Sequence, residues 1–327
     1  MTERYNVVVT RRIPEVGLAV LRDACDVWVN PEDRPLTRDE LLDRIRNADG
    51  VLGQLTDRID AGFFDAAPQL RGYANYAVGF DNIDVAEATK RRVPVSNTPD
   101  VLTIATAEMA WALLFAVARH VVPTDAATRS GTWPGWGPLL FLGTEITGKT
   151  LGIFGPGRIG TAMALMSRGF SMPVVYCGGR KPNVTLEREL GATRLALPDF
   201  LAQSDIVSIH APLTPQTQHV FDAAALAAMK PGAILINTAR GPLVDESALV
   251  AALREGRLAG AGLDVYEFEP RLAEGLRELP NVVLTPHTGS ATTTAREGMA
   301  VLAARNLVAM LTGRTPPSCL NAAVLAG

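Results

Sequence analysis

The feature that most constrains the fold is a glycine-rich turn, Gly155-Pro-Gly-Arg-Ile-Gly160, which comes directly after the apolar run Leu151–Phe154. A GxGxxG pattern between a buried strand and a helix is typical of a phosphate-binding turn. Gly155 allows the tight turn, Gly157 lets the backbone approach a pyrophosphate, and Gly160 lets helix and strand pack closely. The alternative is a tight turn without a ligand, but the strand–turn–helix context favours a dinucleotide site at the helix N-terminus.

Short apolar runs recur along the whole chain, separated by helical patterns. In the second half the runs are Leu151–Phe154, Val174–Tyr176, Ile206–Ile209, Ala233–Ile236, Gly262–Val265 and Val282–Leu284. In the first half they are Asn6–Thr10, Asp26–Val29, Gly50–Gln54, Arg71–Asn75 and Val93–Ser96. Because strands that alternate with helices form parallel sheets, we predict an α/β protein. Its second half is predicted to be a Rossmann-type doubly wound sheet.

Several helices can be placed from their start and stop signals. A capping-box pattern predicts a helix that begins at Thr37. The stretch Ile104–Val121 is apolar nearly all round, so we expect a helix buried between domains or subunits. Residues 129–148 are rich in Gly, Trp and Pro and predict an extended arm. The last helix, about Thr294–Leu311, is expected to end at Gly313.

Composition excludes several classes of protein. A chain of 327 residues, 47% of them hydrophobic, fits two domains with ample cores. The net charge of −3 without a basic tract disfavours nucleic acid as a partner. The polar N-terminus and the short longest apolar run, Ala110–Ala118, argue against a signal peptide and a membrane span. Scattered Cys25, Cys177 and Cys319 indicate a reducing cytoplasm, and no cluster has metal-ligand spacing, so no metal is expected.

The strand after the glycine-rich turn is followed by two cations. Arg180 and Lys181 lie 20 and 21 positions after Gly160, and no acidic residue stands between Cys177 and Lys181. An NAD-preferring site usually has a carboxylate here for the ribose 2′-hydroxyl, whereas a guanidinium pairs well with a 2′-phosphate. We therefore predict a preference for NADP(H), with NAD(H) possible. The alternative is that both cations lie in a solvated loop.

Three polar side chains follow three of the apolar runs. Arg240, Glu269 and His287 are separated by 29 and 18 positions, but each follows a different predicted strand. The carboxyl ends of parallel strands meet at one edge of a sheet, so these residues are expected to converge. The arginine would bind a substrate carboxylate, and the histidine, backed by the glutamate, would move a proton. Alone, each residue has an ordinary structural explanation: a surface charge, a strand end and a loop histidine.

Several motifs resemble the D-2-hydroxyacid dehydrogenase family over nearly the whole chain. Besides the glycine-rich turn, they are Tyr76–Asp84, Met229–Asp245, Gly262–Pro270 and Pro286–Thr292. Within that family, the loop Trp133–Gly143 and the Arg-Lys pair are most similar to the glyoxylate/hydroxypyruvate reductases. The segment Glu267–Leu279 departs from the pattern, because it lacks the His-Pro that commonly follows the Glu-Pro.

The resemblance implies a discontinuous architecture. Residues 1–98 and 289–327 would form a flavodoxin-like substrate-binding domain, and residues 99–288 the dinucleotide-binding domain, with the two crossings as hinges. It also implies a homodimer, with the long apolar helix and the arm at the interface. Trp133 and Trp136 are expected to pack there, whereas His120 and His219 have no recognisable partner and are expected to be structural.

The resemblance also assigns binding residues. The backbone N–H groups of Val78 and Gly79 would bind the substrate carboxylate together with Arg240. Asp264 would accept a hydrogen bond from the nicotinamide amide, or would cap the segment that follows it. The cofactor contacts implied by the motifs and by family position are Thr106, Gly155, Pro156, Gly157, Arg158, Ile159, Gly160, Arg180, Lys181, His210, Ala211, Pro212, Thr217, Thr238, Ala239, Arg240, Asp264, His287 and Gly289.

The function predicted from these features is NADPH-dependent reduction of a small 2-oxo acid, glyoxylate or hydroxypyruvate, to the D-2-hydroxy acid. One alternative keeps the fold and changes the substrate to another D-2-hydroxy acid. Another is a dinucleotide-sensing corepressor or binding protein on the same fold. A formate dehydrogenase is disfavoured, because the resemblance implies a glutamine where this chain has Glu269.

Overall fold

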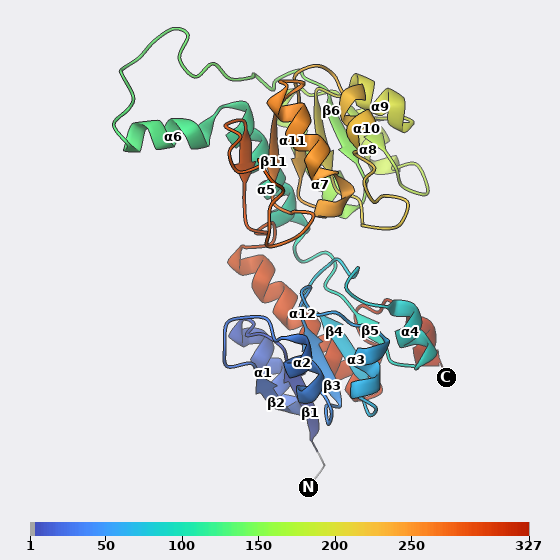
Figure 1. The fold of residues 1–327 in the computed structure, drawn as a ribbon. Coiled ribbons are helices and arrows are strands. Elements are labelled where there is room, and N and C mark those ends of the chain that lie inside the picture. Colours follow the sequence, from blue (N-terminus) through green and yellow to red (C-terminus); the bar gives the residue numbers. More distant parts are fainter. Residues whose placement is uncertain (1–3, 327) are drawn as a thin grey trace. The chain divides into compact units, whose positions relative to one another are not determined.

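The computed structural model describes residues 4–326, which form two compact units (Figure 1). The split unit contains Met1–Leu102 and Ser290–Gly327, and the continuous unit contains Thr103–Gly289. From the sequence, we placed the crossings after residues 98 and 288. In the structure, the chain leaves the split unit after Leu102 and returns to it at Ser290.

The split unit is built on a sheet of five parallel strands, as its apolar runs predict. The strands are β1 (Tyr5–Val9), β2 (Cys25–Val29), β3 (Gly50–Gly53), β4 (Gly72–Asn75) and β5 (Val95–Ser96). Their order is β2-β1-β3-β4-β5, which is the flavodoxin-like order of a doubly wound sheet. The flavodoxin-like prediction is therefore confirmed.

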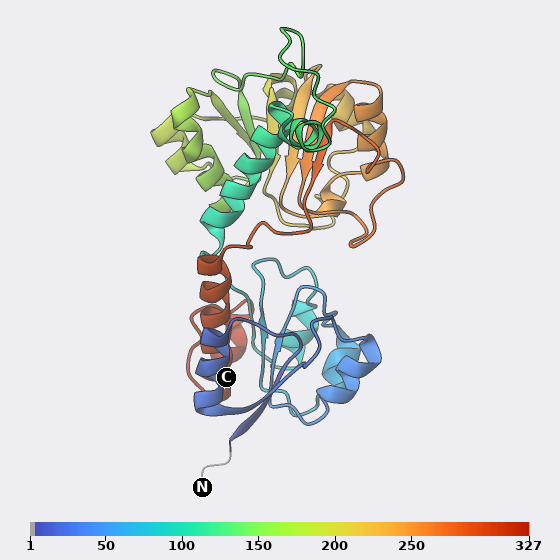
Figure 2. The ribbon, with the colours of Figure 1, turned by 90° about the vertical axis from the view of Figure 1, so that its left-hand side faces the viewer.

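Helices cover both faces of this sheet. They are α1 (Glu15–Ala24), α2 (Arg38–Arg44), α3 (Ala61–Ala66), α4 (Val85–Lys90) and α12 (Thr293–Leu311), with a 3-10 turn η3 (Ala322–Ala326). The capping box of α2 is present, because Thr37 Oγ1 accepts from Glu40 N–H at 3.3 Å while the Glu40 carboxylate accepts from Thr37 N–H at 2.7 Å. Helices α1 and α12 lie side by side (Figure 2), and α12 packs on β3, β4 and β5. A Cβ on Gly17 would lie 2.6 Å from that of Ala300, so glycine permits this close approach.

The continuous unit has a sheet of seven parallel strands. They are β6 (Leu151–Phe154), β7 (Val174–Cys177), β8 (Thr193–Arg194), β9 (Ile206–Ile209), β10 (Ala233–Asn237), β11 (Leu258–Leu263) and β12 (Val282–Leu284). The order β12-β11-β10-β9-β6-β7-β8 reverses between β6 and β9, which is the arrangement of a Rossmann sheet. The predicted fold class is confirmed. The prediction of six strands missed β8, a pair of exposed residues at the sheet edge.

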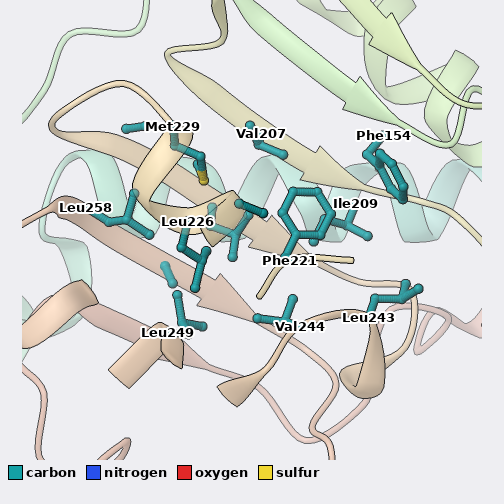
Figure 3. Close-up of a cluster of buried hydrophobic side chains, with 14 of the residues drawn as sticks. Phe154, Val207, Ile209, Phe221, Leu226, Met229, Leu243, Val244, Leu249 and Leu258 are labelled. Atoms are coloured by element: carbon teal, nitrogen blue, oxygen red, sulfur yellow. The ribbon is translucent and has the colours of Figure 1, made fainter. Parts of the chain in front are cut away.

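The core between this sheet and its helices anchors the loops that follow the strands. The helices are α5 (Thr103–Ala118), α6 (Val121–Arg129), α7 (Arg158–Met166), α8 (Val184–Leu190), α9 (Leu197–Gln203), α10 (Ala223–Ala228) and α11 (Glu246–Arg254), with 3-10 turns η1 (Ser167–Phe170) and η2 (Gly241–Leu243). Phe154 and Phe221 meet edge to face with ring centroids 5.1 Å apart (Figure 3). Leu243 and Val244 are fully buried in the same cluster, so the segment just after Arg240 is held in the core.

The long apolar helix is shorter than predicted. Helix α5 ends at Ala118, and His120, with a left-handed φ of 52°, separates it from α6. Within the described chain α6 buries none of its residues, and Figure 1 shows α6 and the loop after it extending away from the rest of the unit. No single helix among residues 4–326 is long and apolar enough to cross a membrane, although α5 and α6, bent by 63°, pass that test jointly by length and composition.

Candidate active site

The glycine-rich turn connects β6 to α7, and its three glycines serve different purposes. Gly155 has a φ of 89°, and a Cβ there would lie 2.5 Å from the Ala211 backbone nitrogen. A Cβ on Gly160 would lie 2.5 Å from the carbonyl oxygen of Gly155. In contrast, a Cβ on Gly157 would meet nothing within 4 Å. Packing therefore requires two of the glycines, and the third leaves open space beside the helix.

That open space lies at the N-terminus of α7. Gly157 is the N-cap and offers no side-chain hydrogen bond to the first turn, which begins at Arg158. The first N–H groups of a helix lack intrahelical acceptors and carry the positive end of the helix dipole. The predicted phosphate contacts Gly157, Arg158, Ile159 and Gly160 thus form a turn that suits a pyrophosphate.

The two cations predicted to contact a 2′-phosphate lie on the loop after β7. Gly178 and Gly179 have φ values of 91° and 76°, so the loop leaves the strand through two left-handed residues. Arg180 and Lys181 follow, and both side chains are exposed. The loop lies against the glycine-rich turn, because a Cβ on Gly179 would be 3.4 Å from the Pro156 ring.

His287 and Glu269 are brought together by the loops after β12 and β11. His287 Nδ1 lies 2.9 Å from Glu269 Oε2, and the other carboxylate oxygen accepts from Tyr266 N–H at 3.0 Å. Burial acts to raise the pKa of Glu269, but the hydrogen bond and charge of His287, the Tyr266 N–H and the charge of Arg240 lower it overall. Glu269 is therefore held as a carboxylate. His287 Nε2 makes no hydrogen bond to residues 4–326, and the residue is half-buried.

Arg240 follows β10, and its charge reaches the same pair. One guanidinium nitrogen, Nη1, donates to the Ala239 carbonyl at 2.7 Å. The turn that presents Arg240 is shaped by Asn237, which is buried. Its Nδ2 donates to the Arg240 carbonyl at 2.9 Å and its Oδ1 accepts from Ala239 N–H at 3.0 Å. The role of Asn237 was not predicted from the sequence, although an asparagine at a strand end is a recognised turn signal.

Asp264 organises the segment that carries His287. One oxygen of its buried carboxylate accepts from Thr285 Oγ1 at 2.6 Å and from Thr288 N–H at 2.7 Å. The other oxygen accepts from Gly289 N–H at 2.7 Å, and the Asp264 carbonyl accepts from His287 N–H at 2.9 Å. These bonds hold His287 in its left-handed conformation, with a φ of 55°. A contact of Asp264 with the nicotinamide amide stays a prediction.

The remaining predicted cofactor residues surround the same strand ends. Thr106 is buried on α5, and His210, Ala211, Pro212 and Thr217 belong to the loop after β9, which Thr217 Oγ1 closes by donating to the Pro212 carbonyl at 2.8 Å. Burial lowers the pKa of His210 to about 3, so its ring is neutral, and it pairs with Ser208 Oγ at 2.8 Å. Thr238 Oγ1 is buried without a hydrogen-bond partner among the described residues. An orphaned hydroxyl at this edge fits a bound ligand.

In the split unit, Val78 and Gly79 lie in the loop after β4, and their carbonyl groups are already paired. The Val78 carbonyl accepts from Asn97 Nδ2 at 2.8 Å, and that of Gly79 from Asn75 Nδ2 at 2.9 Å. No hydrogen bond leaves the N–H of either residue within the described part of the chain. The loop thus offers two free donors, which suits a carboxylate ligand. Asn75 and Asn97, both buried, were missed from the sequence.

A metal site is not formed by the described residues. Within residues 4–326, no group of three or more His, Cys, Asp or Glu side chains is placed to hold an ion.

These features define an NAD(P)-dependent dehydrogenase, and comparison with known proteins identifies its family. Residues 111–289 match the model of the D-isomer specific 2-hydroxyacid dehydrogenase, NAD binding domain. The chain belongs to the D-isomer specific 2-hydroxyacid dehydrogenase family, which confirms the resemblance found in the sequence.

Similar proteins cover nearly the whole chain. The glyoxylate reductase of Thermococcus onnurineus is 52% identical over 324 residues, covering 98% of this chain and 96% of that protein. The glyoxylate reductase of Thermococcus kodakarensis is 52% identical, covering 98% of each chain. Among solved structures, the NADPH-dependent glyoxylate/hydroxypyruvate reductase of Sinorhizobium meliloti, in complex with NADP and malonate, matches with a TM-score of 0.86 and 33% identity over 97% of each chain.

Proposed function

We propose that the protein reduces a small 2-oxo acid, glyoxylate or hydroxypyruvate, to the D-2-hydroxy acid with NADPH. The observation that carries the proposal is the His287–Glu269 pair, whose outer ring nitrogen is free at the sheet edge where the glycine-rich turn also lies. Support for the substrate comes from similar proteins that are glyoxylate reductases.

Each proposed catalytic residue has one task. The cofactor, when bound, supplies the hydride that adds to the carbonyl carbon of the acid. His287 then gives its Nε2 proton to the carbonyl oxygen, and the Glu269 carboxylate stabilises the imidazolium from the Nδ1 side. Arg240 binds the substrate carboxylate and polarises the carbonyl. The free N–H groups of Val78 and Gly79 are proposed as further donors to that carboxylate.

A substrate panel tests this function. The purified protein would be assayed with glyoxylate, hydroxypyruvate, pyruvate and bulkier 2-oxo acids, each with NADPH and with NADH. We expect the highest kcat/KM for glyoxylate or hydroxypyruvate with NADPH. Higher kcat/KM for bulky acids would contradict the substrate assignment, and cofactor binding without turnover of any acid would favour a sensor.

The NADP(H) preference is proposed from Arg180 and Lys181, which are exposed on the loop beside the glycine-rich turn. A similar structure, the S. meliloti reductase, was solved with NADP, which supports the preference. Arg180→Ala should raise KM for NADPH about tenfold while leaving KM for NADH nearly unchanged, since only NADPH carries the 2′-phosphate. An unchanged ratio between the two cofactors would contradict the preference.

A homodimer in the cytoplasm is also part of the proposal. Large apolar side chains are exposed on α6 and the arm, among them Trp136 at 86% and Leu139 at 82%, and such patches mark interaction surfaces. All three cysteines are free thiols, as expected in a reducing compartment. Light scattering should give twice the mass of one chain, and Trp136→Ser should lower the dimer's stability to dilution. A mass of one chain for the wild type would exclude the dimer.

A further inference from the structure

The loop that carries Arg180 and Lys181 is tied at both ends to consecutive residues of the glycine-rich turn. At its start, the Cys177 carbonyl accepts from Gly155 N–H at 2.9 Å. At its end, Asn183 Nδ2 donates to the Pro156 carbonyl at 2.9 Å. The position of the two cations is therefore set by the turn that would hold the pyrophosphate.

Asn183 makes further hydrogen bonds to two helices and a strand. Its Nδ2 also donates to Thr161 Oγ1 on α7 at 2.8 Å, and its Oδ1 accepts from Leu186 N–H at 3.0 Å as the N-cap of α8. Its backbone N–H donates to the hydroxyl of buried Tyr176 on β7 at 2.9 Å. One amide side chain thus joins the glycine-rich turn to two helices, and the backbone of the same residue joins them to a strand.

The loop between these two ties contains two consecutive glycines. Gly178 and Gly179 have positive φ values and the widest conformational freedom of any residue type. The one further tie we find on the loop in the described chain is from Arg194 on β8, whose guanidinium donates to the Gly179 carbonyl at 2.6 Å. If the tie at Asn183 is lost, the segment with Arg180 and Lys181 has to be ordered by the ligand itself, which weakens binding.

We propose that Asn183 is a positioning residue for the 2′-phosphate end of NADP(H). It holds the segment with Arg180 and Lys181 against the glycine-rich turn, so that the two cations and the pyrophosphate turn act on one ligand. This inference rests on the NADP(H) preference proposed above. It adds that Asn183, which does not itself contact the 2′-phosphate, contributes to how strongly NADP(H) is preferred over NAD(H).

The test separates the role of Asn183 as a helix cap from its role as a tie. Asn183→Ser keeps an oxygen that can cap α8, but its side chain is too short to reach the Pro156 carbonyl. The matched control is Asp222→Ser, the same kind of cap change on α10, where Asp222 accepts from Ala225 N–H at 2.8 Å. Dissociation constants for 2′,5′-ADP and for ADP would be measured by calorimetry on the cofactor-free protein, so no turnover is needed.

We expect Asn183→Ser to raise the Kd for 2′,5′-ADP about tenfold and that for ADP less than about threefold. The control should leave both constants within about twofold. Thr161→Val removes the other acceptor of Asn183 Nδ2 and keeps the shape of the side chain, so it should raise the Kd for 2′,5′-ADP about threefold. This variant provides the test if the Asn183→Ser protein does not fold.

Equal weakening of the two ligands, or no weakening, would overturn the inference while leaving the NADP(H) preference intact. If the wild type binds 2′,5′-ADP no more tightly than ADP, the preference itself is wrong and the inference falls with it. Neither result bears on whether a 2-oxo acid is reduced, which the substrate panel decides separately.

Discussion

Two histidine–glutamate pairs occur among the described residues of the continuous unit, and they use opposite edges of the imidazole ring. In one pair, His287 Nδ1 lies 2.9 Å from Glu269. In the other, His219 Nε2 lies 2.7 Å from Glu267. Both histidines have a left-handed backbone, with φ values of 55° and 49°. Among the described residues, Nε2 has no hydrogen-bond partner in the first pair, whereas Nε2 is the nitrogen that faces the carboxylate in the second pair.

The surroundings of the second pair explain its role. Glu246, nearly fully buried, accepts from Glu267 N–H at 2.8 Å, and the Glu267 carboxylate faces Glu246 N–H at 3.4 Å. The backbone N–H of His219 donates to the carbonyl of Pro242 at 2.8 Å, and Pro242 lies in η2, just after Arg240. This pair fastens three loops to one another. We propose that the ring nitrogen left without a partner, and not the presence of a carboxylate, separates the pair used in chemistry from the pair used in structure.

The largest expected effect comes from breaking the first pair. His287→Ala should lower kcat/KM for the preferred 2-oxo acid by at least about a hundredfold, because the proton donor is lost. His219→Ala is the matched control, and we expect its kcat/KM to stay within about threefold of the wild type. Steady-state kinetics measures kcat/KM for both variants. An equal fall in kcat/KM in the two variants would contradict the distinction between the pairs.

A smaller effect is expected from Glu269→Gln. The amide can still accept from Tyr266 N–H, but it carries no charge to stabilise the imidazolium. The loss of one charged hydrogen bond corresponds to a fall in kcat/KM of about tenfold. Glu267→Gln, the same change in the second pair, serves as control. A Glu269→Gln enzyme with wild-type kcat/KM across pH would show that the carboxylate has no part in proton transfer.

The second pair should affect stability more than rate. His219→Ala removes a hydrogen bond between loops, so the free energy of unfolding should fall by about 1 kcal/mol, reduced by the partial exposure of the ring. Urea unfolding of wild type and variant at pH 7 measures this difference. No change in the midpoint would mean that the loops are held by their backbone bonds alone.

The smallest expected effect is in the pH dependence of stability, and its sign differs between two carboxylates. The pKa of Glu269 is lowered below its ordinary 4.5, so its stabilisation is present above pH 4.5 and is lost as pH falls through the folded value. Burial raises the pKa of Glu246 above 4.5, so its contribution is lost as pH rises through the folded value. The stability of the wild type relative to Glu269→Gln should therefore fall on acidification.

Relative to Glu246→Gln, the stability of the wild type should instead fall as pH rises. Unfolding of the three proteins between pH 3 and pH 8 measures both trends. The same sign for the two carboxylates would contradict the burial of Glu246 as the cause.

The Rossmann-type sheet of the continuous unit could be predicted from the sequence, and so could the proximity of His287 to Glu269. Both depend on a signal that recurs along the chain. Apolar runs mark the strands, and parallel strand ends share an edge whatever the length of chain between them. Asn237 had a local signal, an asparagine at a strand end, which was overlooked. The bonds of Asn183 to the Pro156 carbonyl, and of the two buried asparagines of the split unit to the Val78 and Gly79 carbonyls, leave no such signal, because a backbone group has no identity that can be read in a sequence.

The partner of His219 was missed for a similar reason. Glu267 is 48 positions away, on a loop that no periodicity describes. The break after α5 had a signal that was overlooked, because Pro123 in the first turn of α6 is typical of a new helix start. Strand β8 left almost none, since two exposed residues show no alternation.

The return of the chain to the split unit has a consequence for its synthesis. Helix α12 packs on β3, β4 and β5, and the Val95 carbonyl accepts from Leu320 N–H at 2.8 Å, so these three strands lack the cover of α12 until the last part of the chain exists. Domains generally fold as units while the chain emerges from the ribosome. The continuous unit, although it comes second, has all its residues before the split unit does. A nascent chain halted before residue 290 would thus carry a folded dinucleotide-binding unit behind an unfinished N-terminal sheet.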